Sequence, residues 1–268
     1  MTHALGSVAL AAESGPTLSR ARWVPAAVHL IASAGVAAIG ALLIFRLWYP
    51  PPFQAIAGGL SLFVLLVSVD VVLGPALTLV AASPGKSLRE FRRDLAVIVA
   101  LQVAGFAYGI YTIALARPVY EVFEIDRFRV VTAADIDPEE LVKAPPQLQR
   151  LPWLGPRLIA AVKPTDPGEQ VKSINLGFAG IDLSMIPANW RPFSAEAARA
   201  WSAARPVAAL VKRYPEVGSE LSRIAAREGR TSAELRFLPV MSRRASWVAI
   251  LAPPDARVLG YLPVDGFF

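Results

Sequence analysis

Three long apolar runs occupy the first 116 positions of the 268-residue chain. The runs cover residues 24–45, 56–82 and 95–116. Each is as long as the ~20 residues that an α-helix needs to cross the hydrocarbon core of a bilayer. Beyond residue 116 the runs become short, and strand-like alternation mixes with helical periodicity. The pattern predicts three transmembrane helices, preceded by a tail at residues 1–23 and followed by an α+β domain at residues 117–268.

The central run, residues 56–82, holds one ionisable residue, Asp70, near its middle. An acid there costs ~2.5 to 3.5 kcal/mol on insertion, whereas the Leu, Ile, Val and Phe residues of the run together contribute roughly −7 kcal/mol. The run therefore inserts with its acid. Asp70, Gly74 and Thr78 are four apart, which places them on one helix face that favours a protein neighbour over lipid. Pro75 cannot donate a backbone hydrogen bond, so a kink is expected there.

Each of the other two runs also carries a polar group on a face of small residues. His29 lies on such a face in the first run, and Gln102 shares a face with Gly105 and Gly109 in the third. At ~1.5 Å per residue, His29 and Asp70 lie at similar depths. We predict an intramembrane polar cluster of His29, Asp70 and Gln102. Three interpretations are open: these groups hold a helix bundle together, Asp70 receives a cationic group from another membrane helix, or the groups conduct protons or ions.

The basic residues of the short loops predict the orientation of the chain. Arg20 and Arg22 precede the first run, four basic residues lie within 83–94, and Arg46 is alone between the first two runs. The N-terminal tail and the 83–94 loop are therefore predicted to be cytoplasmic. Three crossings place the C-terminal domain on the opposite side, which is the periplasm in a cell with two membranes. A cleaved signal peptide is disfavoured, because no small-residue cleavage site follows the first run.

The composition removes several classes of function. The formal net charge is +6, but the residues after position 116 contain no basic run, which argues against nucleic acid as a partner. The chain has no cysteine, and its two histidines, His3 and His29, both precede the outer domain. Thiol and histidine catalysis and most zinc sites are thereby excluded there. Carboxylate pairs such as Glu121 and Glu124 could serve acid–base catalysis, but at this spacing they are more typical of solvated faces or helix caps. We expect no enzyme, no metal and no cofactor.

The outer domain is predicted to alternate short strands with short helices and to end in an antiparallel meander. The predicted strands cover 119–131, 158–162, 235–240, 246–252 and 257–263, and the predicted helices cover 169–178, 194–204, 206–214 and 217–227. Asp137, followed by Pro138, has the pattern of a helix N-cap. A turn rich in proline at residues 253–256 joins the last two strands.

Three segments together resemble a known family. They are DVVLGPALTLV at residues 70–80, the stretch from RRDLAV at 92–97 into AYGIYTIALARPVYEVFEIDRFRVVTAADI at 107–136, and the closing GYLPVDGFF at 260–268. These segments are similar to the TfpX/TfpZ family of type IV pilin accessory proteins, which are inner-membrane proteins of Gram-negative bacteria. The resemblance implies a non-enzymatic, chaperone-like protein that supports the stability or assembly of a type IV pilin.

Candidate partner-binding residues come from the pattern, since the resemblance supplies none. We select Asp70, Gly74 and Pro75 within the membrane, and Tyr120 and Phe123 outside it. A pilin subunit offers a long apolar helix and an outer head, so the small-residue faces would meet the helix and the outer domain would meet the head. Two alternatives stay open: a membrane-anchored periplasmic sensor or receptor for a small ligand, and a membrane enzyme acting on lipid or cell-wall substrates.

Overall fold

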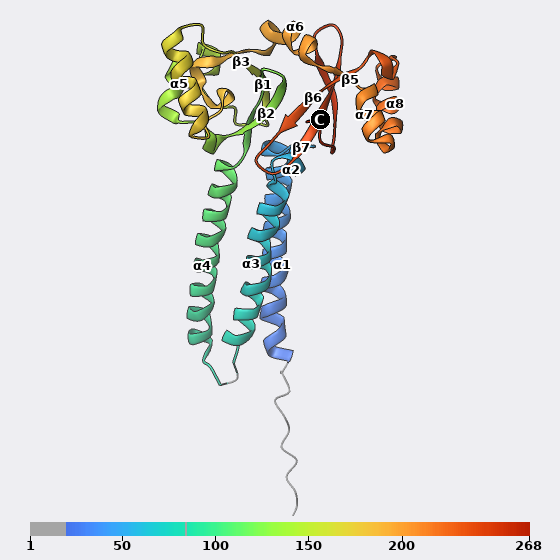
Figure 1. The fold of residues 1–268 in the computed structure, drawn as a ribbon. Helices are drawn as coiled ribbons and strands as arrows, with labels where there is room; N and C mark the ends of the chain where they lie inside the picture. Colours follow the sequence, from blue (N-terminus) through green and yellow to red (C-terminus); the bar gives the residue numbers. More distant parts are fainter. Residues whose placement is uncertain (1–19, 84) are drawn as a thin grey trace, which may run out of the picture. The chain divides into compact units, whose positions relative to one another are not determined.

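The computed structural model describes residues 20–83 and 85–268 (Figure 1). Three long helices are present in this part of the chain. Helix α1 (Arg20–Leu43) continues into the π-helical turn η1 (Ile44–Trp48), and α3 (Gly59–Ala81) and α4 (Leu88–Leu115) follow. The segments Trp23–Trp48, Gly59–Ala81 and Leu88–Leu115 are each long and apolar enough to cross a membrane. We refer to these three segments as the spans.

All three helices begin at residues other than those expected. Helix α1 begins at Arg20 and not at residue 24. Helix α3 begins at Gly59 and not at residue 56, because Gly58, with φ of +72°, separates it from the short helix α2 (Phe53–Ile56). Helix α4 begins at Leu88 and not at residue 95, so much of the basic loop is helical.

The early start of α4 has a local cause. The Ser87 hydroxyl oxygen accepts a hydrogen bond from the Glu90 backbone N–H at 3.3 Å, and the Glu90 carboxylate accepts one from the Ser87 N–H at 2.8 Å. This reciprocal pair is a capping box, which satisfies N–H groups that the first helical turn leaves without a partner. The spacing Ser87 to Glu90 is visible in the sequence and would have predicted this start.

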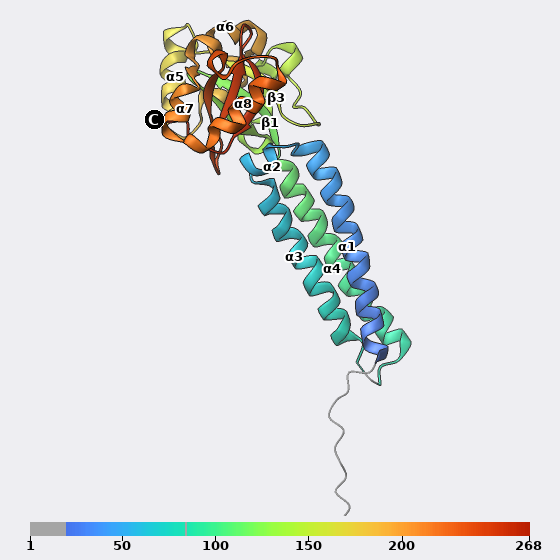
Figure 2. The same ribbon diagram turned by 90° about the vertical axis from the view of Figure 1, so that its right-hand side faces the viewer.

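By packing, the chain divides into two compact units. The first unit holds the described residues up to Val36 together with Val67–Gly105. The second holds Ala37–Leu66 together with Phe106–Phe268. In each unit, segments of α1, α3 and α4 lie side by side (Figure 1 and Figure 2). The second unit therefore contains the loop between the first two spans as well as the whole C-terminal domain.

Residues 117–268, all of which are described, are built on an eight-stranded sheet with the order β4-β3-β1-β2-β6-β7-β8, and β5 pairs with β6. The strands are β1 (Pro118–Glu124), β2 (Arg127–Thr132), β3 (Arg157–Ala161), β4 (Trp190–Pro192), β5 (Arg205–Pro206), β6 (Arg236–Met241), β7 (Ser246–Ala252) and β8 (Arg257–Leu262). The closing β6-β7-β8 meander is antiparallel, as predicted. The rest of the sheet is mixed, because β1 pairs with β3 and β2 with β6 in parallel. Parallel pairing needs long crossover connections. The α-helices of the C-terminal domain all lie in the connection between β2 and β6.

Four α-helices and several 3-10 turns complete this domain. The helices are α5 (Pro167–Phe178), α6 (Phe193–Ala203), α7 (Ala208–Arg213) and α8 (Gly218–Arg227). The 3-10 turns are η2 (Ala133–Asp135), η3 (Pro138–Lys143), η4 (Pro146–Leu148), η5 (Leu183–Met185), η6 (Pro187–Asn189), η7 (Pro215–Val217) and η8 (Ser232–Glu234). Asp137 caps η3 by accepting a hydrogen bond from the Glu139 N–H at 2.9 Å, as predicted. The helical membrane part and the α+β domain confirm the expected fold class.

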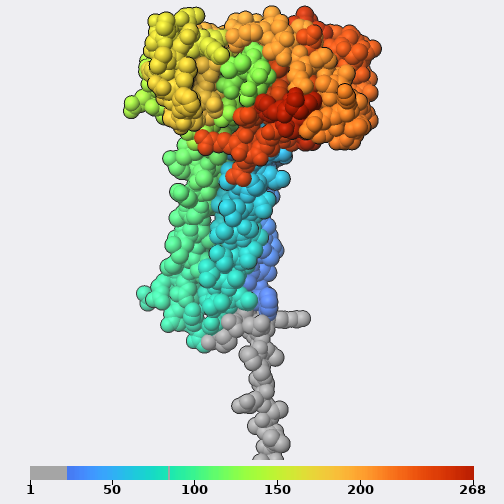
Figure 3. Space-filling view, in the orientation of Figure 1, coloured from blue at the N-terminus to red at the C-terminus, as the bar shows by residue number. Residues whose placement is uncertain are grey.

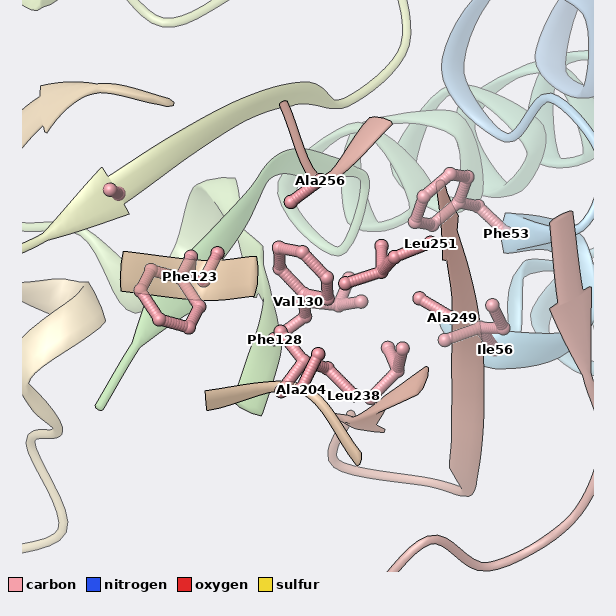
Figure 4. Close-up of a cluster of buried hydrophobic side chains, with 13 residues drawn as sticks. Phe53, Ile56, Phe123, Phe128, Val130, Ala204, Leu238, Ala249, Leu251 and Ala256 are labelled. Atoms are coloured by element: carbon pink, nitrogen blue, oxygen red, sulfur yellow. The ribbon is translucent and has the colours of Figure 1, made fainter. Parts of the chain in front are cut away.

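The loop between the first two spans contributes to the core of the C-terminal domain. Phe53 and Ile56 of α2 are buried in one hydrophobic cluster with residues of β1, β2, β6 and β7 (Figure 4). The ring of Phe53 lies 5.6 Å from that of Tyr261 in β8, in an edge-on arrangement. Burying a side chain of this size stabilises a fold by about 2 to 3 kcal/mol. The loop is thus a structural element of the C-terminal domain and more than a connection between helices.

Candidate partner-binding surfaces

The polar groups of the first unit form two hydrogen-bonded pairs. Nδ1 of His29 lies 2.6 Å from Oγ1 of Thr78, and Thr78 is fully buried. Nε2 of Gln102 donates a hydrogen bond to the backbone carbonyl of Asp70 at 3.1 Å. The prediction joined His29 to Asp70 by depth alone. The partner of His29 is instead the hydroxyl of Thr78, which lies two turns beyond Asp70 in α3 and on the same helix face.

The carboxylate of Asp70 itself makes no hydrogen bond or ion pair with any described residue, and the residue is half-buried. Gly74 is buried and allows Gln102 to approach, since a Cβ there would lie 2.2 Å from the Gln102 amide nitrogen. Helix α3 continues through Pro75. This face of α3 therefore combines a close helix contact with a carboxylate that has no partner within the described chain.

Tyr120 and Phe123, the two candidates outside the membrane, are fully buried. The Tyr120 ring lies 4.9 Å from that of Trp190, and the Phe123 ring lies 5.9 Å from that of Phe128. The reason is that β1 is a central strand of the sheet with other segments packed on both faces, so every residue of the strand is buried. A central strand covered on both faces has a nearly continuous apolar sequence, and these aromatics belong to it. In this fold they offer no surface to a partner.

Helix α5 exposes three large apolar side chains to solvent. Val171, Ile174 and Phe178 are 59%, 59% and 88% exposed, and no residue of this helix is buried. Their spacing of three and four residues places them in one stripe. We call these three residues the α5 stripe; α5 is the yellow helix at the edge of the domain in Figure 1 and forms an outer surface in Figure 3. Contiguous exposed apolar groups mark interaction sites on folded proteins.

Comparison with known proteins shows the family to which the chain belongs. Residues 18–58, a stretch that includes α1, η1 and α2, match the family model described as Fimbrial assembly protein FimB. The "Fimbrial assembly protein, serogroup I" of Dichelobacter nodosus is 36% identical over 242 residues, which cover 90% of this chain and 94% of that relative. The chain belongs to the fimbrial assembly protein family.

Two further relatives from Dichelobacter nodosus agree with this assignment. The serogroup E1 fimbrial assembly protein is 35% identical over 242 residues, which cover 90% of this chain and 94% of the relative. The protein of serogroups C1 and C2 is 44% identical over 117 residues, which cover 44% of this chain and 89% of the relative. No significant match is found among solved structures. The resemblance to pilus accessory proteins is confirmed by these relatives.

The buried acids of this fimbrial assembly protein do not form a catalytic pair. Glu121 and Glu124 are 3% and 6% exposed, so the expectation of a solvated face is wrong. They are three positions apart on one strand, which directs them to opposite faces of the sheet. Glu121 accepts a hydrogen bond from the Tyr261 hydroxyl at 2.6 Å, and Glu124 accepts one from the Ser184 N–H at 3.0 Å. Within the described residues, no group of three or more His, Cys, Asp or Glu side chains could hold a metal ion.

Burial dominates the electrostatics of both acids. Desolvation raises the pKa of Glu121 to about 7, although the hydrogen bond from Tyr261 acts in the opposite direction. Burial also raises the pKa of Glu124, and the hydrogen bonds from Ser184 oppose that rise. The pKa of Tyr261 is raised as well, by burial and by the neighbouring carboxylate. These groups make the stability of the domain depend on pH.

Proposed function

We propose that this fimbrial assembly protein binds a type IV pilin subunit at the inner membrane and supports its stability or its assembly, without catalysing a reaction. Membership of the family supports a role in pilus assembly. The observation that carries binding as the mechanism is the α5 stripe, an apolar surface that the fold leaves uncovered. A folded head held outside the membrane is the partner such a surface would meet.

We propose that the C-terminal domain lies in the periplasm. The loop between the first two spans shares a hydrophobic core with this domain, so both lie on the same side of the membrane. That loop, residues 49–58, contains no Lys or Arg. Arg46 near the end of the first span and Arg117 just after the third span are the basic residues at this end, whereas Arg20, Arg22 and four basic residues within 83–94 lie at the other end of the spans. Loops with more Lys and Arg stay in the cytoplasm. The charge distribution and the shared core therefore support the same orientation.

Within the membrane, we propose that Asp70 receives a cationic group from the partner's helix. The helix contacts of the first unit use the backbone carbonyl of Asp70 and the side chains of His29, Thr78 and Gln102. They do not use the Asp70 carboxylate, which weakens the interpretation that it holds the bundle together. The two pairs share no residue, which weakens the interpretation as a proton or ion path.

The variant Asp70→Asn tests this role. The Asp70 carboxylate of the wild type makes no hydrogen bond within the described chain, so the Asn variant should accumulate in the membrane like the wild type. The amount of pilin and the number of pili should fall several-fold, since a charged contact in the membrane is lost. The two quantities are measured by immunoblot and electron microscopy. If Asp70→Asn itself fails to accumulate, the carboxylate is structural and the proposal is wrong.

The α5 stripe is tested by replacing Val171, Ile174 and Phe178 with serine together. No residue of α5 is buried, so the melting temperature of the purified protein should stay within a few degrees of the wild type. Pilin abundance and piliation should fall to the level of a clean deletion, and crosslinking of pilin to α5 in cells should disappear. The matched control replaces Glu169 and Lys172 on the same helix with serine. Equal piliation in the stripe variant and this control would contradict a docking role.

A further inference from the structure

A cavity of about 350 Å³ lies in the second unit, where α3 begins and α4 ends. Its lining has two chemical parts. Leu62 and Leu115 contribute apolar surface from the two helices, whereas Arg243 and Arg244 contribute guanidinium groups from the loop between β6 and β7. Leu62 is three residues beyond the start of its span, and Leu115 is the last residue of its span. The cavity therefore lies at the depth where the hydrocarbon core of a bilayer gives way to the headgroups.

The charge of the cavity comes from one arginine. Arg243 is paired with Asp135 at 2.5 Å, and the Asp135 side chain is 1% exposed. The other carboxylate oxygen of Asp135 accepts hydrogen bonds from the N–H and the hydroxyl of Thr132, both at 2.8 Å. Arg244 has no acidic partner among the described residues. The lining thus carries a net charge of +1, and the acid within it is already paired with Arg243.

Arg244 is held in place by its neighbours. Its guanidinium lies 3.4 Å from the Ser61 hydroxyl, and its side chain packs directly on Gly58, where a Cβ would lie 2.1 Å from Cδ of Arg244. The Ser242 hydroxyl donates to the Ile56 carbonyl at 2.5 Å and accepts from the Arg244 N–H at 3.1 Å. These contacts tie the β6-β7 loop to the segment before α3, so the arginine is positioned before any ligand arrives.

We propose that this cavity binds the headgroup of an anionic membrane phospholipid. Arg244 pairs with the phosphodiester, for which a guanidinium has matching geometry, and Leu62 and Leu115 contact the first methylenes of an acyl chain. One phosphodiester charge balances the net charge of the lining. An ammonium-bearing headgroup fits less well, because the only acid in the lining, Asp135, is buried and paired. Phosphatidylglycerol has the expected chemistry and phosphatidylcholine does not.

The test measures lipid retention by the purified full chain in a nonionic detergent, using native mass spectrometry. Delipidated protein is titrated with phosphatidylglycerol, with phosphatidylcholine and with inorganic phosphate. The wild type should retain one phosphatidylglycerol molecule, and Arg244→Gln should weaken this binding about tenfold, the loss expected for one charged hydrogen bond. The matched control is Arg227→Gln, which removes the same charge from an exposed position of α8 and should bind like the wild type.

A second variant keeps the charge and changes the space. Leu115→Trp fills the apolar part of the cavity, so this variant should also lose phosphatidylglycerol although it retains Arg244. If Arg244→Gln does not fold, the result for Leu115→Trp decides whether the cavity binds the lipid. Equal retention of phosphatidylglycerol by the wild type and both variants would overturn the site. Equal binding of phosphatidylcholine and phosphatidylglycerol would overturn the charge argument. Displacement of the lipid by millimolar inorganic phosphate would show a site for soluble phosphate and overturn the lipid assignment.

Discussion

Gly59→Ala should deplete the folded protein from the membrane, although it adds one methyl group. A Cβ at Gly59 would lie 2.4 Å from Cδ1 and 2.6 Å from Cε1 of Tyr49. The ring has no room to move, because Tyr49 is fully buried and its hydroxyl donates to the Ile113 carbonyl at 3.1 Å. Overpacking a core costs about 1 to 3 kcal/mol, and losing the hydroxyl bond adds about 1 kcal/mol. The melting temperature in detergent and the steady-state level in cells measure this loss.

Two other glycines of the long helices provide matched controls. A Cβ at Gly35 or at Gly105 would meet no heavy atom within 4 Å. Alanine is also a better helix former than glycine by about 1 kcal/mol, so Gly35→Ala and Gly105→Ala should leave the protein level and melting temperature unchanged or slightly raised. If Gly59→Ala behaves like these controls, the Tyr49 ring does not pack directly against Gly59 at the start of α3.

Features set by local sequence could be predicted. The three long helices follow from runs of apolar residues, and the final meander follows from alternating strands with a proline-rich turn. The N-cap at Asp137 likewise depends on residues that are adjacent in the chain. The start of α4 was missed only because the capping box of Ser87 and Glu90 was not recognised. For all of these, short-range physics determines the structure.

Features set by contacts between distant segments could not be predicted. The burial of Tyr120 and Phe123 depends on residues that pack on the two faces of β1, such as Trp190 and Phe193, and these follow more than 60 residues later. The insertion of Phe53 and Ile56 into the core of the C-terminal domain joins residues that are far apart in the chain. Apolar side chains in a short loop are equally compatible with membrane, core or partner, so the sequence alone does not choose among them.

The environment of the α5 stripe is a further feature that the sequence could not predict. Residues 169–178 were expected to be helical, and the apolar spacing of Val171, Ile174 and Phe178 is that of a face directed to a core. The structure leaves this face uncovered. Periodicity reports that a helix has an apolar face, but the identity of what covers the face comes from the three-dimensional arrangement. Candidate docking surfaces in this protein therefore had to be found in the structure.

The stability of the protein should fall as the pH rises from about 4.5 to about 7, and Glu121→Gln should remove much of this dependence. Burial raises the pKa of Glu121 from 4.5 to about 7 in the fold. Between these values the folded state holds a proton that the unfolded state releases, so stability decreases as the pH increases. The stabilisation is complete below pH 4.5 and is lost above pH 7. The shift corresponds to roughly 3 kcal/mol.

Glutamine keeps a neutral acceptor for the Tyr261 hydroxyl and cannot ionise. Glu121→Gln should therefore match the wild type near pH 4.5 and be more stable at pH 8, by up to roughly 3 kcal/mol, which melting curves at several pH values can measure. A residual slope remains from Glu124, whose pKa is also raised by burial. The exposed Glu139→Gln is the matched control and should follow the wild type. An unchanged pH slope in Glu121→Gln would show that this carboxyl is ionised in the folded protein across the whole range, and the buried pair with Tyr261 would then need a different description.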